Sequence, residues 1–196
     1  MAKITWKPGT LEAPLPPVMV TSSSGGKDNV FTAAWTGIIN SEPPKTYVSI
    51  RPERFSHGLV SESGEFVINL PTEALIRAVD FVGVKSGRDM DKFEAAGLTK
   101  EPASAVGCPL IAESPVNLEC RVFDVLHLGT HDMFLADIVA VDVDDAYIDE
   151  KGRFAMEKCG LAAYAHGTYF ALGKKLGTYG FSVKKRKTAR HGGTKK

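Results

Sequence analysis

The segment between residues 116 and 143 carries the strongest structural signal in the sequence. Alternate residues from Val116 to Val122 are apolar, which is the period-two pattern of a strand with one buried face. Beyond the turn-like stretch LGTHD, an almost continuous apolar run extends from Met133 to Val143. Two long strand-like runs around one short turn predict a long antiparallel hairpin that is buried on at least one face.

Shorter elements surround this hairpin. Further strands are predicted at 18–21, 30–39, 46–52 and 65–70. Helices are predicted from about Glu53, over 72–84 with Thr72 as N-cap, and from about Met90 to Ala96. Strands outnumber helices and do not alternate regularly with them, so a doubly wound sheet is disfavoured. The predicted fold class is mainly β, a closed antiparallel barrel or sandwich with helical insertions.

Charge is distributed unevenly along the 196 residues. The last 13 residues, KKRKTARHGGTKK, hold seven Lys or Arg and no acid, so the remainder carries 17 basic and 23 acidic residues, or 17 − 23 = −6. We therefore expect one folded domain over residues 1–183 and a disordered basic tail over 184–196. An acidic body argues against nucleic acid as the main partner.

Cysteine usage and hydropathy indicate the compartment. The three cysteines are widely spaced and form no C-x-x-C pair, so we expect reduced thiols, a cytoplasmic protein and no metal. No apolar run approaches the roughly 20 residues that span a membrane, so we expect no membrane association. The phosphate-binding patterns G-x-G-x-x-G and G-x-x-x-x-G-K-[ST] do not occur at a strand end.

The strand within NVFTAAWTGIIN has an unusual composition. Its centre, Thr32, Ala33 and Ala34, carries almost no bulk, between Phe31 and Trp35. Small side chains in a strand indicate either close sheet packing or the close approach of another group. The residues alone leave both interpretations open, with Trp35 expected to resume the barrel wall.

Several pieces of the sequence, in their order and spacing, resemble one known family. The pieces are NVFTAAWTGIINSEPPKTYVSIRPERFSHGLV, EFVINLP, SGRDMDKFEAAGL, CPLIAESPVNLECRV, LGTHDMFLADIVAV and YFALGKKLGTYGFSV. Together they look like the flavoredoxin branch of the flavin reductase-like proteins and cover about residues 15–183. The resemblance implies a homodimer of six-stranded antiparallel Greek-key split barrels, each with FMN bound noncovalently near the dimer interface.

The resemblance also implies where FMN lies. The small strand would contact the isoalloxazine ring, and the strand end and helix start that follow it would hold the ribityl phosphate. Charge-assisted donors suited to a phosphate are present in both later segments. The candidate cofactor-binding residues are Asn29, Thr32, Ala33, Ala34, Trp35, Ser49, Ile50, Arg51, Ser56, His57, Ser86, Arg88 and Lys92.

His131 is the candidate catalytic residue. In flavin reductases a Gly-Asp-His segment on this hairpin lines the nicotinamide side of the flavin, and here the segment reads GTHD, with Thr130 where that Asp would stand. An imidazole there can position a donor or shuttle a proton. A histidine bonded to backbone in a hairpin turn is the alternative.

Three functions are compatible with these residues. The first is an NAD(P)H-dependent flavin reductase that uses FMN. The second is a flavoredoxin-like carrier that passes electrons between redox protein partners. The third is a β-barrel interaction domain that has lost its flavin. In the first two the flavin performs the redox chemistry and the protein supplies binding and orientation.

Overall fold

The computed structural model describes residues 1–184, so all but Lys184 of the predicted basic tail lies outside the described residues. The strands are β1 Val18–Ser24, β2 Lys27–Ala33, β3 Thr36–Ser41, β4 Pro44–Ile50, β5 Glu65–Leu70, β6 Lys100–Glu101, β7 Leu110–Ile111, β8 Val116–His127, β9 Asp132–Val143, β10 Ala162–Ala165 and β11 Thr168–Ala171. The helices are α1 Phe55–Ser63, α2 Ile76–Val84 and α3 Lys92–Ala96, with 3-10 turns η1 Glu73–Leu75, η2 Asp145–Tyr147, η3 Met156–Lys158 and η4 Phe181–Val183.

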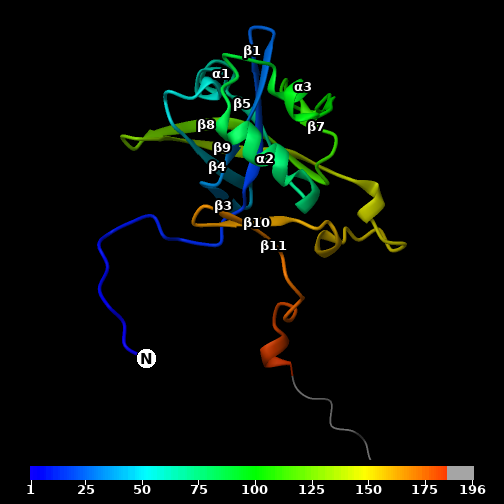
Figure 1. Cartoon of the computed structure of the whole chain (residues 1–196). Helices are drawn as coiled ribbons and strands as arrows, with labels where there is room; N and C mark the ends of the chain where they lie inside the picture. The colour runs from blue at the N-terminus through cyan, green and yellow to red at the C-terminus, as the bar shows by residue number, and fades with distance from the viewer. Residues whose placement is uncertain (185–196) are drawn as a thin grey trace, which may run out of the picture.

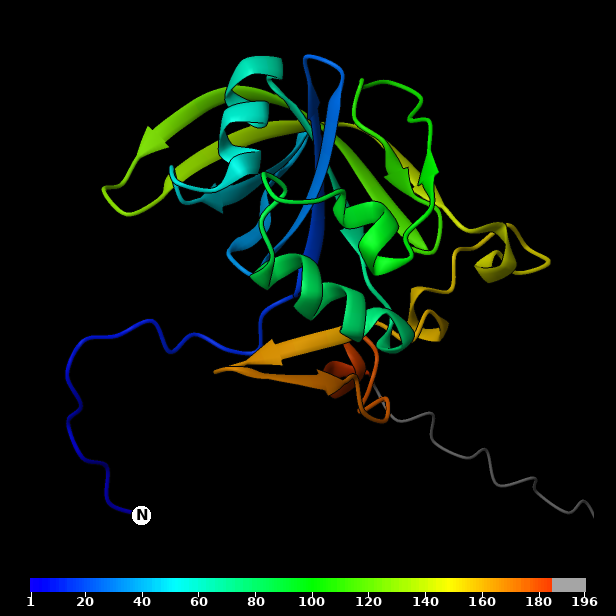
Figure 2. The same cartoon turned by 45° about the horizontal axis from the view of Figure 1, so that its top comes forward.

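The main sheet confirms the mainly β fold class. It holds seven strands in the order β2-β1-β5-β8-β9-β4-β3, and every neighbouring pair is antiparallel. The two long strands β8 and β9 form the predicted hairpin and extend beyond the rest of the sheet (Figure 1). The shorter hairpin β10–β11 lies apart from the main sheet and close to α2 in both views (Figure 2).

A bend between β2 and β3 closes the barrel. These strands occupy the two opposite edges of the sheet, yet only Ala34 and Trp35 separate them in sequence. The backbone N–H of Ser49 donates to the carbonyl of Trp35 (2.9 Å), which carries the β3–β4 pairing up to the bend. If β2 and β3 are counted as one bent strand, six strands surround the core.

The prediction of one continuous strand over 30–39 is therefore wrong at its centre. Phe31 and Ala33 both pack into the barrel interior, so strict alternation would also point Trp35 inward. The bend breaks the alternation, and Trp35 stays 40% exposed instead of resuming the wall. The bend is needed because the chain must pass from one edge of the sheet to the other.

Two apolar layers hold the fold. The barrel interior contains Val20, Phe31, Phe66 and Phe134, all buried. On the outer face of β1 and β2, a second cluster joins the sheet to α2 and α3; its buried members are Met19, Val30, Val79, Val82, Phe93, Leu98 and Ile111. Val79 and Val82 lie on the face of α2 that the apolar spacing predicted.

The helix boundaries differ from the sequence-based expectations. The first helix begins at Phe55 and not at Glu53. The helix expected from Thr72 is split into η1 and α2, and the Thr72 side chain makes no capping hydrogen bond. α3 begins after Asp91, whose carboxylate accepts from the N–H groups of Phe93 and Glu94 (2.9 and 3.3 Å), and this cap explains its late start.

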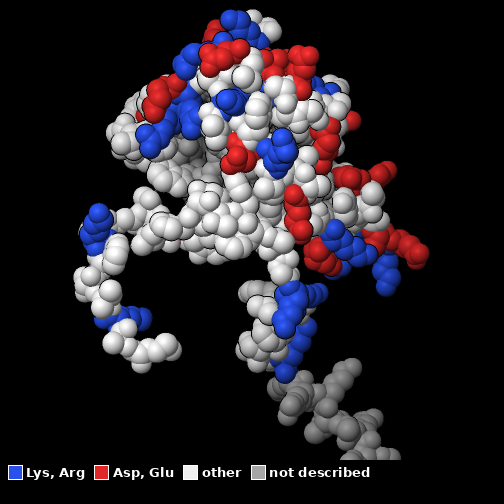
Figure 3. All heavy atoms as spheres, viewed as in Figure 1, with Lys and Arg blue, Asp and Glu red and all other residues white. Residues whose placement is uncertain are grey.

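The surface divides into two regions in the view of Figure 3. Charged side chains of both signs cover the upper part of the body, while the lower part around β10 and β11 is largely uncharged. Residues 1–14 extend away from the body as an arm (Figure 1). Among residues 1–184, no helix is both long and apolar enough to cross a membrane.

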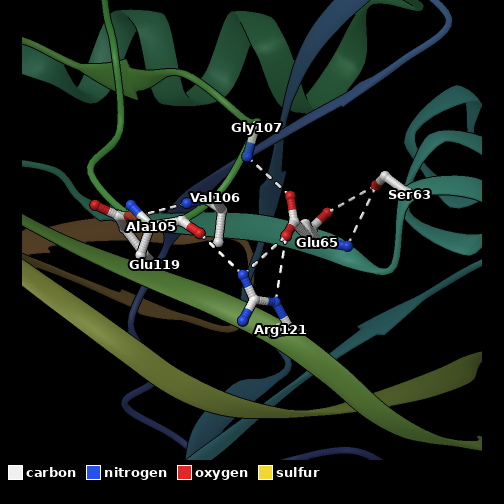
Figure 4. Close-up of polar contacts among 7 residues, drawn as sticks. All are labelled: Ser63, Glu65, Ala105, Val106, Gly107, Glu119 and Arg121. Carbon is white, nitrogen blue, oxygen red and sulfur yellow. Dashed lines mark hydrogen bonds and ion pairs between the residues drawn. The ribbon is translucent and has the colours of Figure 1, made fainter.

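Two glutamates fasten the loop after β6 to the barrel wall (Figure 4). Glu119 is fully buried, and its carboxylate accepts from the N–H groups of Ser104, Ala105 and Val106 (2.7, 2.6 and 3.0 Å) and from the Ser104 hydroxyl (2.7 Å). Glu65 accepts from the N–H of Gly107 (2.8 Å). Burial opposes ionisation of Glu119, but these donors outweigh it and hold the pKa of this carboxyl below its usual range.

Asp142 lies close to the same carboxylate, and its pKa is shifted in the opposite direction. Its Oδ2 is buried and meets no donor among the described residues. Burial and the neighbouring Glu119 raise the pKa of Asp142. A raised pKa favours the protonated form of Asp142, whose proton the neighbouring Glu119 carboxylate can accept.

We expect Asp142→Asn to flatten the pH dependence of folding stability. Because the folded-state pKa of Asp142 is raised, the stability from its proton is fully present below the ordinary value of 3.8 and is lost as the pH rises through the raised value. An asparagine keeps a donor toward Glu119 at every pH. Urea unfolding between about pH 4 and pH 8 measures this, with the exposed Asp145→Asn as control. Parallel stability profiles for the variant and the parent would contradict a raised pKa of Asp142.

Candidate functional site

Two adjoining cavities lie where β2, β4, α1 and α2 meet. The basic cavity, about 500 Å³, is lined by Asn29, Phe31, Arg51, Glu53, Arg54, Phe55, Ser56, Lys85, Ser86, Gly87, Arg88 and Lys92. The central cavity, about 490 Å³, is lined by Pro17, Phe31, Thr32, Ala33, Ala34, Trp35, Ser49, Ile50, Arg51, Arg54, Asp80, Gly83, Val84, His131, Tyr164 and Tyr169. Phe31, Arg51 and Arg54 line both, so the two cavities form one continuous recess.

The basic cavity concentrates positive charge. Five of its lining side chains are Lys or Arg and one, Glu53, is acidic. Arg51 makes an exposed 3.6 Å contact with Glu53, which leaves the guanidinium free to turn toward a ligand. The first turn of α1, at Phe55 and Ser56, also borders the cavity, and helix N-termini attract anions.

Close contacts fix the loop from Lys85 to Asp91 against β2. Asn29 is buried, and its Nδ2 donates to the Ser56 hydroxyl (2.6 Å). A Cβ at Gly87 would lie 2.1 Å from Asn29 Oδ1 and 2.9 Å from Phe55 Cδ1. Only a glycine therefore lets the loop backbone approach β2 so closely, which brings Ser86 and Arg88 to the cavity.

Lys92 anchors the other end of this loop. Its side chain is 3% exposed, and Nζ donates to the carbonyls of Val82 (2.9 Å) and Lys85 (3.3 Å) at the C-terminus of α2. Burial, with a smaller effect from Arg54, lowers the pKa of Lys92 to about 8. The ammonium group thus serves both as a structural tie and as a positive charge beside the cavity.

The central cavity has a small-residue wall and an aromatic rim. Ala33 and Ala34 border it without filling it. The Thr32 hydroxyl donates a hydrogen bond to the carbonyl oxygen of Val79 in α2. The hydroxyl of Thr32 is therefore already engaged within the protein. Tyr164 and Tyr169 pack together (ring centroids 5.3 Å apart), and the Tyr169 hydroxyl donates to Asp80 (3.3 Å).

His131 reaches this cavity from the start of β9. Its imidazole lies against Trp35, with ring centroids 4.4 Å apart and planes tilted by 43°. Burial and, secondarily, the positive charge of Arg51 lower the pKa of His131 below 6.5. The imidazole is therefore neutral at pH 7 and can accept or donate a proton at the cavity wall.

His57 lies elsewhere. Its Nε2 contacts Asp132 Oδ2 (2.7 Å), while the other carboxylate oxygen contacts Nδ1 of His127 (2.8 Å). These two hydrogen bonds hold the pKa of Asp132 low and join α1 to the turn end of the β8–β9 hairpin. His57 lines neither the basic nor the central cavity. Within residues 1–184, no group of three or more His, Cys, Asp or Glu side chains is arranged to hold a metal ion.

The structure thus brings together most of the residues singled out from sequence. Apart from His57, every candidate cofactor-binding residue, and His131, lines one of the two cavities. Sequence reasoning did not select Arg54, although it lines both cavities and its guanidinium donates to the carbonyl of Gly83 (3.1 Å). Its position three residues after Arg51 was the available signal. Gly87 gave no such signal because its role depends on a tertiary contact.

We expect Arg51→Ala to raise the pKa of His131 without restoring it fully to 6.5. The substitution removes the nearby positive charge, but burial of the imidazole remains. NMR titration of the His131 ring protons in both proteins measures the shift. Arg77→Ala, on the exposed face of α2, is the matched control. An unchanged pKa in Arg51→Ala would show that the guanidinium charge does not reach the imidazole.

Comparisons with known proteins agree with this geometry. The family model described as "Flavin reductase like domain" matches residues 10–173. The structure resembles flavoredoxin of Desulfovibrio vulgaris (Miyazaki F), with a TM-score of 0.86, 30% identity and coverage of 93% of this chain and 100% of that one.

Two further relatives are informative. An FMN-binding protein from Thermus thermophilus, solved with bound 1-cyclohex-2-enone, gives a TM-score of 0.76 at 27% identity, covering 91% of this chain and 97% of that one. An uncharacterized protein of Archaeoglobus fulgidus is 38% identical over 125 residues, which are 64% of this chain and 71% of the relative. The chain therefore belongs to the flavin reductase-like family, and it is similar to the flavoredoxins within that family.

Proposed function

We propose that this protein binds FMN across the two cavities and acts as a flavoprotein oxidoreductase. The observation that carries the proposal is the continuity of a strongly basic recess with a recess walled by small residues. A phosphate bearing close to two negative charges fits the first, and a flat ring system fits the second. Family membership and the likeness to flavoredoxin support the assignment.

The basic cavity offers a donor set suited to a phosphate monoester. Arg51 and Arg88 would supply guanidinium groups, and Ser56 and Ser86 would supply hydroxyls. Arginine forks bind phosphate with charge-assisted hydrogen bonds that are about twice as strong as neutral ones. Arg88 at present donates to the carbonyl of Glu53 (2.9 Å), which holds its side chain across the cavity rim.

The central cavity would place the ring between backbone and aromatic side chains. Ala33 and Ala34 leave the strand backbone accessible for hydrogen bonds to the polar ring edge. Trp35 and His131 stand at one side and Tyr164 at another. Bound FMN would supply the capacity to accept a hydride or single electrons, while the chain's own residues orient it and limit water access. His131, neutral at pH 7, is the group that can hold or move a proton there.

We propose reduced nicotinamide as the electron donor, as in flavin reductases. The alternative is an electron carrier that exchanges electrons with redox proteins. One observation favours this alternative. The carboxylate of Asp132, the residue after His131, is hydrogen-bonded to His57 and His127 and is therefore already engaged within the protein. The likeness to a flavoredoxin points the same way.

We also propose that the protein forms a homodimer and works in the cytoplasm. Val139, Val141 and Val143 are 38%, 54% and 36% exposed and share one face of β9. A row of exposed valines is typical of a surface that a second subunit covers. The three cysteines are free and buried, as expected in a reducing compartment. A single-subunit mass by light scattering at all concentrations would contradict the dimer.

The phosphate end of the proposal is tested with Gly87→Ala. The added methyl group would displace the loop that carries Ser86 and Arg88, so we expect FMN affinity to fall at least tenfold, about 1.4 kcal/mol. Riboflavin, which lacks the phosphate, should lose much less. Flavin fluorescence quenching measures both ligands. Gly58→Ala is the control because a Cβ there meets nothing within 4 Å. Equal losses for FMN and riboflavin would argue against a phosphate in the basic cavity.

The ring end is tested with Ala34→Leu. We expect the larger side chain to occupy the central cavity and to abolish copurification of flavin, while circular dichroism and thermal unfolding stay close to the parent. Ala74→Leu, on an exposed turn, serves as control. Full flavin retention in Ala34→Leu would mean that this strand does not face the ring.

The electron donor is identified by anaerobic reduction. We expect the purified protein to show flavin absorbance that bleaches within seconds of adding NADH or NADPH. Bleaching by a reduced ferredoxin but by neither nucleotide would establish the carrier instead. A protein with no flavin absorbance that also fails to quench added FMN would overturn the whole proposal.

A further inference from the structure

One buried carboxylate joins three elements beside the proposed flavin site. Asp132, the residue after His131, is 7% exposed. Its Oδ2 contacts Nε2 of His57 in α1 (2.7 Å), and its Oδ1 contacts Nδ1 of His127 in β8 (2.8 Å). Neither histidine lines the basic or the central cavity. His57, Asp132 and His127 together form a carboxylate latch whose purpose the flavin site alone does not explain.

The latch closes the hairpin turn at both of its ends. β8 ends at His127 and β9 begins at Asp132, so the turn consists of residues 128–131. The N–H of Leu128 donates to the carbonyl of His131 (3.0 Å), and Gly129 has a positive φ of 92°. A short turn that contains a glycine has conformational freedom of its own. Its position relative to the barrel is therefore fixed by the bonds at its ends.

Asp132 and His131 point to opposite faces of the sheet. Asp132 and Phe134 are alternate residues of β9, and Phe134 belongs to the buried barrel interior. The His57 ring meets the Phe134 ring edge-on, with centroids 5.2 Å apart, so α1 and the carboxylate meet on this inner face. The His131 ring lies on the other face, against Trp35. Anchoring Asp132 inside thus fixes where the neighbouring imidazole stands outside.

The latch also connects the two ends of the proposed flavin site. Phe55 and Ser56, in the first turn of α1, line the basic cavity, and His57 is the next residue. His131 lines the central cavity. A single carboxylate therefore joins the helix at the phosphate end of the recess to the turn that carries the imidazole at its ring end.

We propose that Asp132 is a positioning residue, which through its hydrogen bonds to His57 and His127 holds the His131 imidazole against Trp35 at the wall of the central cavity. Both carboxylate oxygens are engaged, so Asp132 is suited to hold the turn and not to exchange a proton with a ligand. The placement is a property of the chain itself, whereas its effect on catalysis rests on the proposed function. A misplacement of about 1 Å in an active site can cost on the order of a hundredfold in rate.

Two substitutions at His57 separate the hydrogen bond from packing. Leucine and glutamine are similar in size, but only the glutamine amide can donate to Asp132. NMR of the full-length protein without added flavin follows the His131 ring protons, which His131→Gln assigns. In His57→Leu we expect the ring-current shift from Trp35 to shrink and the pKa of His131 to rise toward 6.5, because the imidazole leaves its partly buried place. In His57→Gln both should stay close to the parent.

The catalytic consequence is measured in the FMN-loaded protein. With whichever donor bleaches the parent flavin, His57→Leu should slow anaerobic reduction at least tenfold, and His57→Gln should recover most of the rate. FMN affinity should stay within about threefold, because the donors of the basic cavity are unchanged. Ser61→Ala is the matched control, since Ser61 is an exposed residue of α1 whose hydroxyl lies 3.5 Å from Nδ1 of His57, outside the latch.

His127→Leu provides a second measurement. The His127 side chain is 78% exposed, so this variant should fold, and we expect a smaller movement of the same His131 signals. If His57→Leu does not fold, His127→Leu decides. Unmoved His131 signals in the folded variants would overturn the proposal. Equal movement in His57→Leu and His57→Gln would also overturn it, because packing and not the hydrogen bond would then place the imidazole.

The failure of this proposal can be told from the failure of the flavin assignment. Moved His131 signals with an unchanged reduction rate would overturn the catalytic consequence of the latch. A parent protein that binds no FMN, but whose His131 signals move as expected in His57→Leu, would refute the proposed function and leave the latch in place.

Discussion

The bend at Ala34 and Trp35 is the constraint on which the site depends. A sheet closes into a barrel only if its two edges meet, and here the edges are two halves of one strand. Within two residues the chain must stop pairing with β1, as β2, and begin to pair with β4, as β3. Bulky residues facing inward would obstruct that turn, whereas Ala33 and Ala34 permit it. Barrel closure and the space for a ligand therefore have the same physical origin.

The bend also explains an exposed tryptophan. Burying a tryptophan removes about 150–250 Å² from water, worth about 4–6 kcal/mol at about 25 cal/mol per Å². Leaving 40% of Trp35 exposed forgoes on the order of 2 kcal/mol of that gain. The barrel interior is already filled by Phe31, Phe66 and Phe134, so it offers no alternative site. The indole instead packs against His131 and lines the central cavity.

Features that arise from local sequence patterns could be predicted from the sequence, whereas features that depend on contacts distant in sequence could not. The β8–β9 hairpin and the apolar face of α2 arise from local periodicity, and both were found. The cofactor-binding candidates came from the family resemblance, and the recess contains all of them except His57. The position of His57 depends on Asp132, which lies 75 residues away in sequence, and no local pattern encodes that bond. The break at Trp35 was missed for the same reason, since closure of the barrel is a global requirement.

The basic side chains are distributed unevenly along the recess that the bend creates. All five basic side chains of the recess come from the end of β4, the start of α1, the loop after α2 and the first residue of α3. Trp35, His131 and the N-terminal arm contribute none among the described residues that line the two cavities. A ligand with a phosphate can therefore lie in only one direction, with its charged end toward α1 and its ring toward Trp35.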